Sequence, residues 1–241
     1  MSTSINRLQE RTQDGSVLIG EIVPAAFTLA TMLRHRKMAV WLREEFDGYT
    51  AIELLPRYRC HQPGHVEVNS PAYGWARVPI DESTIAGLGY LDLYDSVQVL
   101  EQVFLNGKKG GGYRNVLSKD AEAVLQQELS VNTVKAFNQG RADDGWKHEL
   151  VGAELAFYRN RDVYSRVLRT VRATIYLWCD ALMEIGIGGD HNSYSTAERQ
   201  AVEHLNAPET FWISAMETVD DLPVPDPRRV KLLGRLFGSG G

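Results

Sequence analysis

The residues with the clearest metal-binding chemistry lie together in one short stretch of the chain. Cys60, His61 and His65 offer a thiolate and two imidazoles, which are ligands that zinc prefers. A structural zinc site needs a fourth ligand, and the sequence has no Cys-x-x-Cys pair to supply it. On a strand, Cys60 and His61 would also point to opposite faces. The pattern therefore favours a buried cysteine beside two surface histidines, and we predict no metal ligands and no cofactor.

Nucleophilic and phosphate-binding chemistry is represented only by fragments of motifs. Lys108–Gly112 has the composition of a phosphate-binding loop, but a Walker loop needs an earlier glycine and a Ser or Thr after the lysine. No Gly-x-Ser-x-Gly is present, and His148 lacks the second histidine of a zinc-protease helix. Adjacent carboxylates form pairs typical of solvated surface, namely Glu44-Glu45, Asp143-Asp144 and Asp220-Asp221. We assign no catalytic residue and favour a non-enzymatic protein; the alternative is a dispersed active site around His148 or His191.

Arginines alternate with aromatic residues between positions 57 and 77, a combination that contacts phosphates and stacks on bases in nucleic-acid-binding proteins. The arginines are Arg57, Arg59 and Arg77, and the aromatic residues are Tyr58, Tyr73 and Trp75. The same pattern is typical of a strand that has arginines on its solvent-exposed face and aromatic residues in the core. The chain has 26 Lys and Arg against 31 Asp and Glu, so its net charge of -5 gives no general attraction to nucleic acid. We favour the strand and do not expect nucleic acid as a partner.

The longest element that the pattern predicts is a helix over Asp162–Ile185, about 35 Å long at about 1.5 Å per residue. Its apolar stripe is wider than one packed face requires, so we expect one side in the core and the other against a protein partner or a second copy. The interface candidates are Tyr164, Val167, Leu168, Val171, Ile175, Trp178 and Leu182.

The remaining pattern predicts an α+β fold in which helices pack around a small antiparallel sheet, with this long C-terminal helix and a short extension. We expect a helix over Ser16–Glu45 that breaks or starts afresh at Pro24. Within Leu55–Ile80 we expect a hairpin that turns at Gln62–Gly64, with Trp75–Ile80 as a further short strand or extended arm. Helices over Leu91–Leu105 and Lys119–Leu129 and a strand within Glu149–Tyr158 complete the prediction.

Composition along the chain and at its termini indicates the domain organisation and the cellular compartment. A domain over residues 1–188 is followed by an extension, 189–241, that holds a linker, a proline-rich tail from Pro223 and a terminal Gly240-Gly241. Two cysteines are too few for a disulfide framework, so we expect the cytoplasm. No leader of basic and then apolar residues precedes Arg11, and no apolar run reaches the ~20 residues of a membrane span, so we expect no membrane partner.

Three short stretches carry a resemblance to a known family. Trp41–Tyr49 resembles the acidic, Trp-containing helix of the AbiTii family, which ends in Asn-Gly-Tyr, although Asp47 stands where asparagine is usual. Leu55–Arg59 resembles its Leu-Pro-x-Tyr-Arg entry to a strand, and Val78–Ile80 is similar to its Val-Pro-Ile step. The likeness covers about residues 16–188.

The resemblance implies a component of an abortive-infection system that protects bacteria from phage. It implies an adaptor, sensor or regulatory protein that binds protein partners of a defence operon or its own copies. It brings no catalytic residues to transfer. The alternative function is a nucleic-acid-directed effector that uses Arg57, Arg59 and Arg77, or a cryptic hydrolytic toxin.

Overall fold

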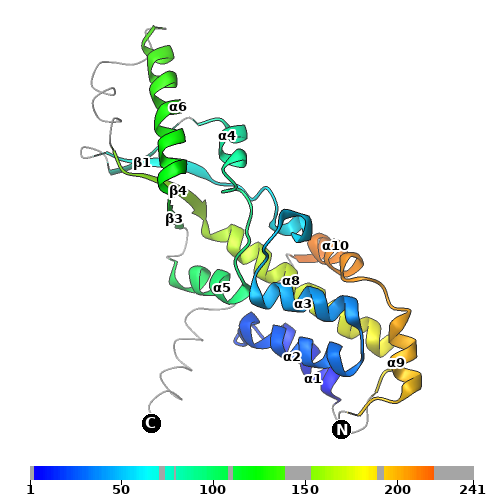
Figure 1. Ribbon diagram of the computed structural model, residues 1–241. Helices are drawn as coiled ribbons and strands as arrows, with labels where there is room; N and C mark the ends of the chain where they lie inside the picture. Colours follow the sequence, from blue (N-terminus) through cyan, green and yellow to red (C-terminus); the bar gives the residue numbers. More distant parts are fainter. Residues whose placement is uncertain are drawn as a thin grey trace. The chain divides into compact units, whose positions relative to one another are not determined.

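The computed structural model describes residues 3–70, 74–78, 80–107, 111–138, 153–188 and 193–219, and it confirms the α+β class (Figure 1). The chain divides into two compact units, which are described separately below. Unit 1 comprises Met1–Tyr58, Tyr94–Asn106 and Tyr164–Gly241, and unit 2 comprises Arg59–Leu93 and Gly107–Val163. Within the described residues, no helix combines the length and the apolar character needed to cross a bilayer.

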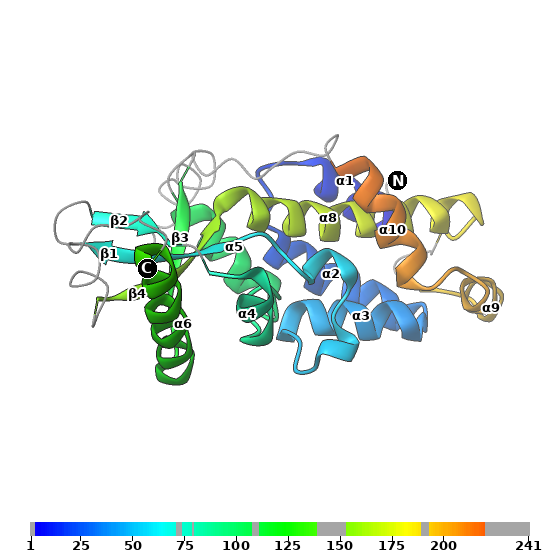
Figure 2. The same cartoon turned by 90° about the horizontal axis from the view of Figure 1, so that it is seen from above.

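Unit 1 is helical (Figures 1 and 2). Its elements are α1 (Ser4–Gln13), α2 (Ile19–Met32), α3 (Arg36–Asp47), the 3₁₀ turn η1 (Ile52–Leu54), α5 (Val97–Asn106), most of α8 (Arg161–Glu184), α9 (Thr196–Glu203) and α10 (Pro208–Thr218). Helix α2 packs against α1, α3 and α5, and α10 packs against α3. The apolar residues of α2 are buried because α2 has neighbours on several sides.

The break in the first long helical segment lies at Arg34, so the predicted break at Pro24 is wrong. Helix α2 continues through Pro24, where the flanking Val23 is buried in the core. The chain turns where Arg34 adopts a φ of 61°. The amide of His35 donates to Ala30 O at 2.9 Å, and that of Arg34 to Thr31 O at 3.1 Å, which together form a Schellman cap. A proline removes one helix hydrogen bond, and here the packing around it outweighs that loss.

Two buried charges fix the connection between α1 and α2. The guanidinium of Arg172, on α8, donates to four backbone carbonyls at 2.5–3.3 Å, those of Arg11, Thr12, Asp14 and Val17. The carboxylate of Glu101, on α5, accepts from the amides of Ile19 and Gly20 at 2.7 and 3.1 Å, and so caps the start of α2. Burial raises the pKa of Glu101 and lowers the pKa of Arg172, while their mutual attraction opposes both shifts.

Helix α8 confirms the predicted long helix, but its apolar stripe lies inside unit 1. All seven interface candidates are buried: Tyr164, Val167, Leu168, Val171, Ile175, Trp178 and Leu182. The indole of Trp178 also donates to Nδ1 of His35 at 3.1 Å, which ties α8 to the corner between α2 and α3. These side chains pack in the core of the monomer. A role for them in self-association stays a prediction.

Unit 2 contains a four-stranded antiparallel sheet in the order β2-β1-β4-β3. The strands are β1 (His65–Ser70), β2 (Gly74–Arg77), β3 (Gly112–Val116) and β4 (Leu155–Asn160). The predicted hairpin with a turn at Gln62–Gly64 is wrong: Arg57–Arg59 forms a 3₁₀ turn, η2, and the hairpin joins β1 to β2. Tyr58 and Arg59 are both buried, and this consecutive burial is incompatible with the alternation of a half-exposed strand.

One face of this sheet forms the core of unit 2 with α4 (Glu82–Gly87) and α6 (Lys119–Asn138). The buried residues are Val66, Val68, Val78, Ile85, Leu91, Leu117, Ala121, Leu125, Leu129, Leu155 and Phe157. The predicted strand before Tyr158 is confirmed as β4, and the helix from Lys119 runs further than predicted. Strands β3 and β4 approach so closely that a Cβ on Gly112 would meet Arg159 O at 2.4 Å.

Candidate functional site

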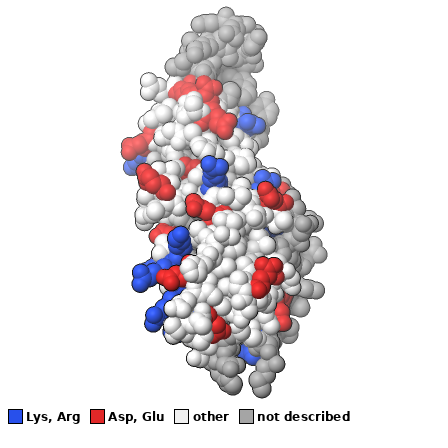
Figure 3. Space-filling model, turned by 90° about the vertical axis from the view of Figure 1, so that its right-hand side faces the viewer, with Lys and Arg blue, Asp and Glu red and all other residues white. Residues whose placement is uncertain are grey.

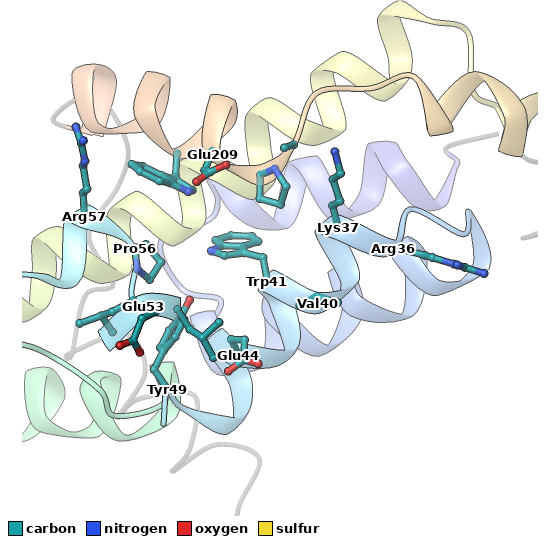
Figure 4. Close-up of a pocket in the computed structure, with 15 residues that line it drawn as sticks. Arg36, Lys37, Val40, Trp41, Glu44, Tyr49, Glu53, Pro56, Arg57 and Glu209 are labelled. Atoms are coloured by element: carbon teal, nitrogen blue, oxygen red, sulfur yellow. The ribbon is translucent and has the colours of Figure 1, made fainter. Parts of the chain in front are cut away.

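A groove of about 530 Å³ that combines apolar and charged side chains lies between α3, the segment 53–57 and α10 of unit 1 (Figure 4). Trp41 from α3 points toward α10. Leu55 and Pro56, which lie between the 3₁₀ turns at Ile52–Leu54 and Arg57–Arg59, line a second side of the groove. Pro208 and Trp212 line a third side from α10. The walls are helices and turns, in which backbone N–H and C=O groups bond to one another. A ligand in the groove would therefore be recognised mainly by side chains.

The floor of the groove is held by a buried hydrogen-bond network. Oε1 of Glu45 accepts from the hydroxyls of Tyr49 and Tyr58 at 2.6 and 2.5 Å, and the Tyr58 hydroxyl accepts from the indole of Trp41 at 3.0 Å. The ring of Tyr58 meets that of Trp212 edge to face, with centroids 5.7 Å apart. The network joins α3, η2 and α10, so it fixes the aromatic side chains before any ligand binds.

A glycine makes this network possible. Helix α3 ends at Gly48, whose φ is 92°, and the amide of Gly48 closes the last turn onto Glu44 O at 2.9 Å. The next amide, that of Tyr49, donates to Tyr94 O at 2.8 Å. A Cβ at position 48 would lie only 3.0 Å from the same Tyr94 oxygen. Glycine therefore lets the chain turn against residue 94 and brings Tyr49 back to Glu45.

The rim of the groove is exposed and carries charges of both signs. The side chains of Val40 and Leu54 are 61% and 53% exposed, which is high for aliphatic residues beside a cavity. Six charged residues line the groove: Arg36, Lys37, Arg57, Glu44, Glu53 and Glu209. None of the six forms an ion pair within 4.0 Å with another described residue. The rim therefore combines apolar surface with charges that stay available to a ligand.

The three arginines that the sequence grouped for nucleic acid differ in exposure. Arg57 is exposed on the rim of the groove in unit 1, and Arg77 is exposed at the end of β2 in unit 2. Arg59 is buried and donates from Nη1 to Leu93 O at 3.0 Å, so its side chain is not presented at the surface. On the face drawn in Figure 3, acidic and basic side chains are interspersed among neutral ones. A nucleic-acid contact through Arg57 and Arg77 stays an untested alternative.

The cysteine and histidines considered for zinc also have other roles. His65 Nε2 lies 3.2 Å from Glu67, and the His65 ring packs against Tyr158 at 4.9 Å. The amide of His61 donates to Asp92 at 2.9 Å. Burial and, secondarily, the charge of Asp92 raise the pKa of the Cys60 thiol. Among the described residues, no three His, Cys, Asp or Glu side chains are grouped to hold a metal ion.

Several sequence candidates cannot be placed, because they lie outside the described residues. They are Lys108–Gly110 of the glycine-rich loop, Asp143-Asp144, His148, His191, Asp220-Asp221, the tail from Pro223 and the terminal Gly240-Gly241.

The structure is that of an α+β protein with an open groove on its helical unit. The chain matches the AbiTii family over residues 4–207, and it therefore belongs to that family. The match begins at α1 and includes α9, so it is wider than the resemblance over residues 16–188. Family membership implies a role in abortive infection, a defence against phage. Comparisons with curated proteins and with solved structures gave no match.

The groove itself was not among the sites predicted from the sequence, although its parts were visible. Trp41–Tyr49 and Leu55–Arg59, two of the three stretches that carry the resemblance, supply most of its floor. The third wall, α10, starts at Pro208, directly after the family match ends. The signal that marked the site was the density of Trp, Tyr and Pro in two neighbouring stretches. The sequence alone does not show that these two stretches contact each other and α10 in the folded chain.

Proposed function

We propose that this chain is a non-enzymatic adaptor, sensor or regulatory protein of an abortive-infection system and that it holds a protein partner in the groove. The observation that supports this most strongly is the rim, where exposed Val40 and Leu54 stand beside charges without ion pairs, above a floor fixed by Glu45. A rigid aromatic floor with an apolar and charged rim is the usual composition of a protein-binding hot spot.

The mixture of charges favours a protein partner over nucleic acid. A nucleic-acid groove concentrates arginine and lysine along a phosphate path, whereas Glu44, Glu53 and Glu209 line this groove together with Arg36, Lys37 and Arg57. A partner with charges of both signs is therefore favoured. The partner of this proposal is encoded with the chain in a defence operon, or is a second copy of the chain. The interaction takes place in the cytoplasm, where Cys60 and Cys179 stay reduced.

The experiment is affinity capture from phage-challenged cells that carry the intact defence locus. The chain is compared with Leu54→Asp, which places a charge on the exposed rim, and with Val99→Asp on α5. Val99 is 44% exposed and does not line the groove, so this variant matches the change in chemistry at a different place. Each sample is treated with nuclease before quantitative mass spectrometry.

We expect one protein to be retained by the wild type and by Val99→Asp and to fall at least about tenfold with Leu54→Asp, which corresponds to about 1.4 kcal/mol of binding free energy. Equal retention by all three proteins contradicts the proposal. Retention that disappears with nuclease treatment supports the nucleic-acid effector instead.

A further inference from the structure

We propose that the groove receives residues 222–229 of the same chain, Leu-Pro-Val-Pro-Asp-Pro-Arg-Arg, as an extended polyproline segment. This inference rests on the proposed function, because it assumes that the groove is a binding site. It deepens that function by naming how the site is regulated: the tail occupies the groove until the protein partner displaces it. The segment follows α10, one wall of the groove, and lies outside the described residues.

The backbone chemistry of the segment fits a groove made of helices and turns. Pro223, Pro225 and Pro227 have no backbone N–H, and prolines at this density favour the polyproline II conformation, which needs no hydrogen bonds of its own. The walls offer no strand edge that a β-strand could extend, but they offer Trp41 and Trp212. Aromatic-lined grooves are the surfaces on which proline-rich segments dock in proteins. A segment that is already extended also loses little conformational entropy on binding.

The charges of the segment also complement the groove. Asp226 lies between two prolines, and Arg228-Arg229 follow the last one. The groove presents cations at Arg36, Lys37 and Arg57 and carboxylates at Glu44, Glu53 and Glu209. Since none of these six pairs with another described residue, each is available to an ion of the segment. Exposed pairs contribute little each, so they would mainly set the direction in which the segment lies.

The length of the chain permits docking within one molecule. Trp212 lies in the wall of the groove, and Thr218 ends α10 about 9 Å further along the helix. Val219 is helical and buried, so the tether is residues 220–222, which can span about 10 Å when extended and so can return beside α10. Residues 222–229 then cover about 25 Å as polyproline II. A short tether gives an effective concentration in the millimolar range, so even a weak segment occupies its own groove.

The test places a photoreactive residue in the groove of the purified full-length chain. Leu54 is replaced with benzoylphenylalanine, which its exposed position tolerates, and the same residue is placed at Val99 as a control. The proline variant Pro223→Ala, Pro225→Ala, Pro227→Ala is irradiated in parallel. The crosslinked products are sized and their joined peptides are sequenced.

We expect the position-54 crosslink to stay at the mass of one chain, to join residues 222–229, and to fall several-fold in the proline variant. The Val99 position should give no such product. Crosslinks at the mass of two chains show that the occupant belongs to a second copy and overturn the proposal. Crosslinks to residues 230–237, a yield unchanged by the proline variant, or no joined peptide also overturn it.

This outcome is separable from that of the proposed function. If residues 222–229 do not crosslink while Leu54→Asp still loses its partner in the capture experiment, the groove binds a protein but not its own tail. If Leu54→Asp retains its partner, the proposed function fails whatever the tail does.

Discussion

Unit 1 uses charge in two contrasting ways. In its core, Arg172 and Glu101 are buried, and every hydrogen bond described for their side chains goes to a backbone group. On the rim of the groove, Arg57, Glu53 and Glu209 form no ion pair with another described residue. Burying a charge is costly, and a core tolerates it only when hydrogen bonds compensate. The core charges are therefore structural, and the rim charges are available for binding.

The largest effect should come from breaking the core arrangement at Arg172. Arg172→Met leaves four carbonyl oxygens between α1 and α2 without their donor and leaves Glu101 without its nearest compensating cation. We expect the free energy of unfolding to fall by about 3 to 5 kcal/mol in urea titrations. Arg166→Met, an exposed position on the same helix, should change it by less than about 0.5 kcal/mol. If the two substitutions lowered the free energy of unfolding by similar amounts, the claim that buried and exposed charges of unit 1 have different roles would be wrong.

A second core effect depends on pH. Burial, with a smaller contribution from the charge of Lys37, lowers the pKa of His35 to about 4, and the neutral ring accepts from the Trp178 indole. The unfolded chain takes up a proton near pH 6.5, well before the folded chain does. Neutral His35 therefore makes its full contribution to the free energy of unfolding above pH 6.5. This contribution, about 3 kcal/mol, is lost as the pH falls from 6.5 toward 4.

The matched variant is His35→Gln, which cannot titrate in this range. Between pH 7 and pH 4, the unfolding free energy of the wild type should fall more steeply than that of His35→Gln, as followed by urea unfolding at each pH. Parallel curves for the two proteins would show that His35 does not stay neutral in the folded state.

A smaller effect connects the core with the groove. Tyr58→Phe removes the hydroxyl that accepts from Trp41 and donates to Glu45. We expect the free energy of unfolding to fall by about 1 to 3 kcal/mol, because Trp41 and Glu45 stay buried but lose this hydrogen-bond partner. Trp41 should also become less well fixed, so its fluorescence should be more readily quenched by acrylamide. A variant with unchanged stability and quenching would show that the floor is held by packing alone.

The sequence predicted the parts of the fold that depend on regular spacing. The apolar stripe of α8 repeats over several turns, so its helix was recognisable. The apolar stretch Glu149–Tyr158 could have been strand or helix, and the favoured strand is β4. Two predictions failed where tertiary contacts override the local signal. Pro24 continues a helix because its neighbours are buried, and Tyr58 belongs to a 3₁₀ turn because its hydroxyl is bound between Glu45 and Trp41.

The candidate site was harder to predict than the fold. Spacing identifies which face of an element is apolar but not which element covers it, and so the stripe of α8 suggested a partner although unit 1 itself buries it. Conversely, the spacing placed Val40 on the apolar face of its helix, and only the structure shows that it is 61% exposed and lines one groove with Leu54 and Trp212. The groove depends on contacts between residues far apart in the chain, which spacing does not encode.

The most direct test of this account measures stability and protection from phage on the same variant. Leu54→Asp should keep its unfolding free energy within about 0.5 kcal/mol of the wild type, because the side chain is 53% exposed. In cells with the intact defence locus, the same substitution should abolish the reduction in plaque number, while Val99→Asp should preserve it. Full protection by a stably folded Leu54→Asp protein would contradict the claim that the groove is the functional surface.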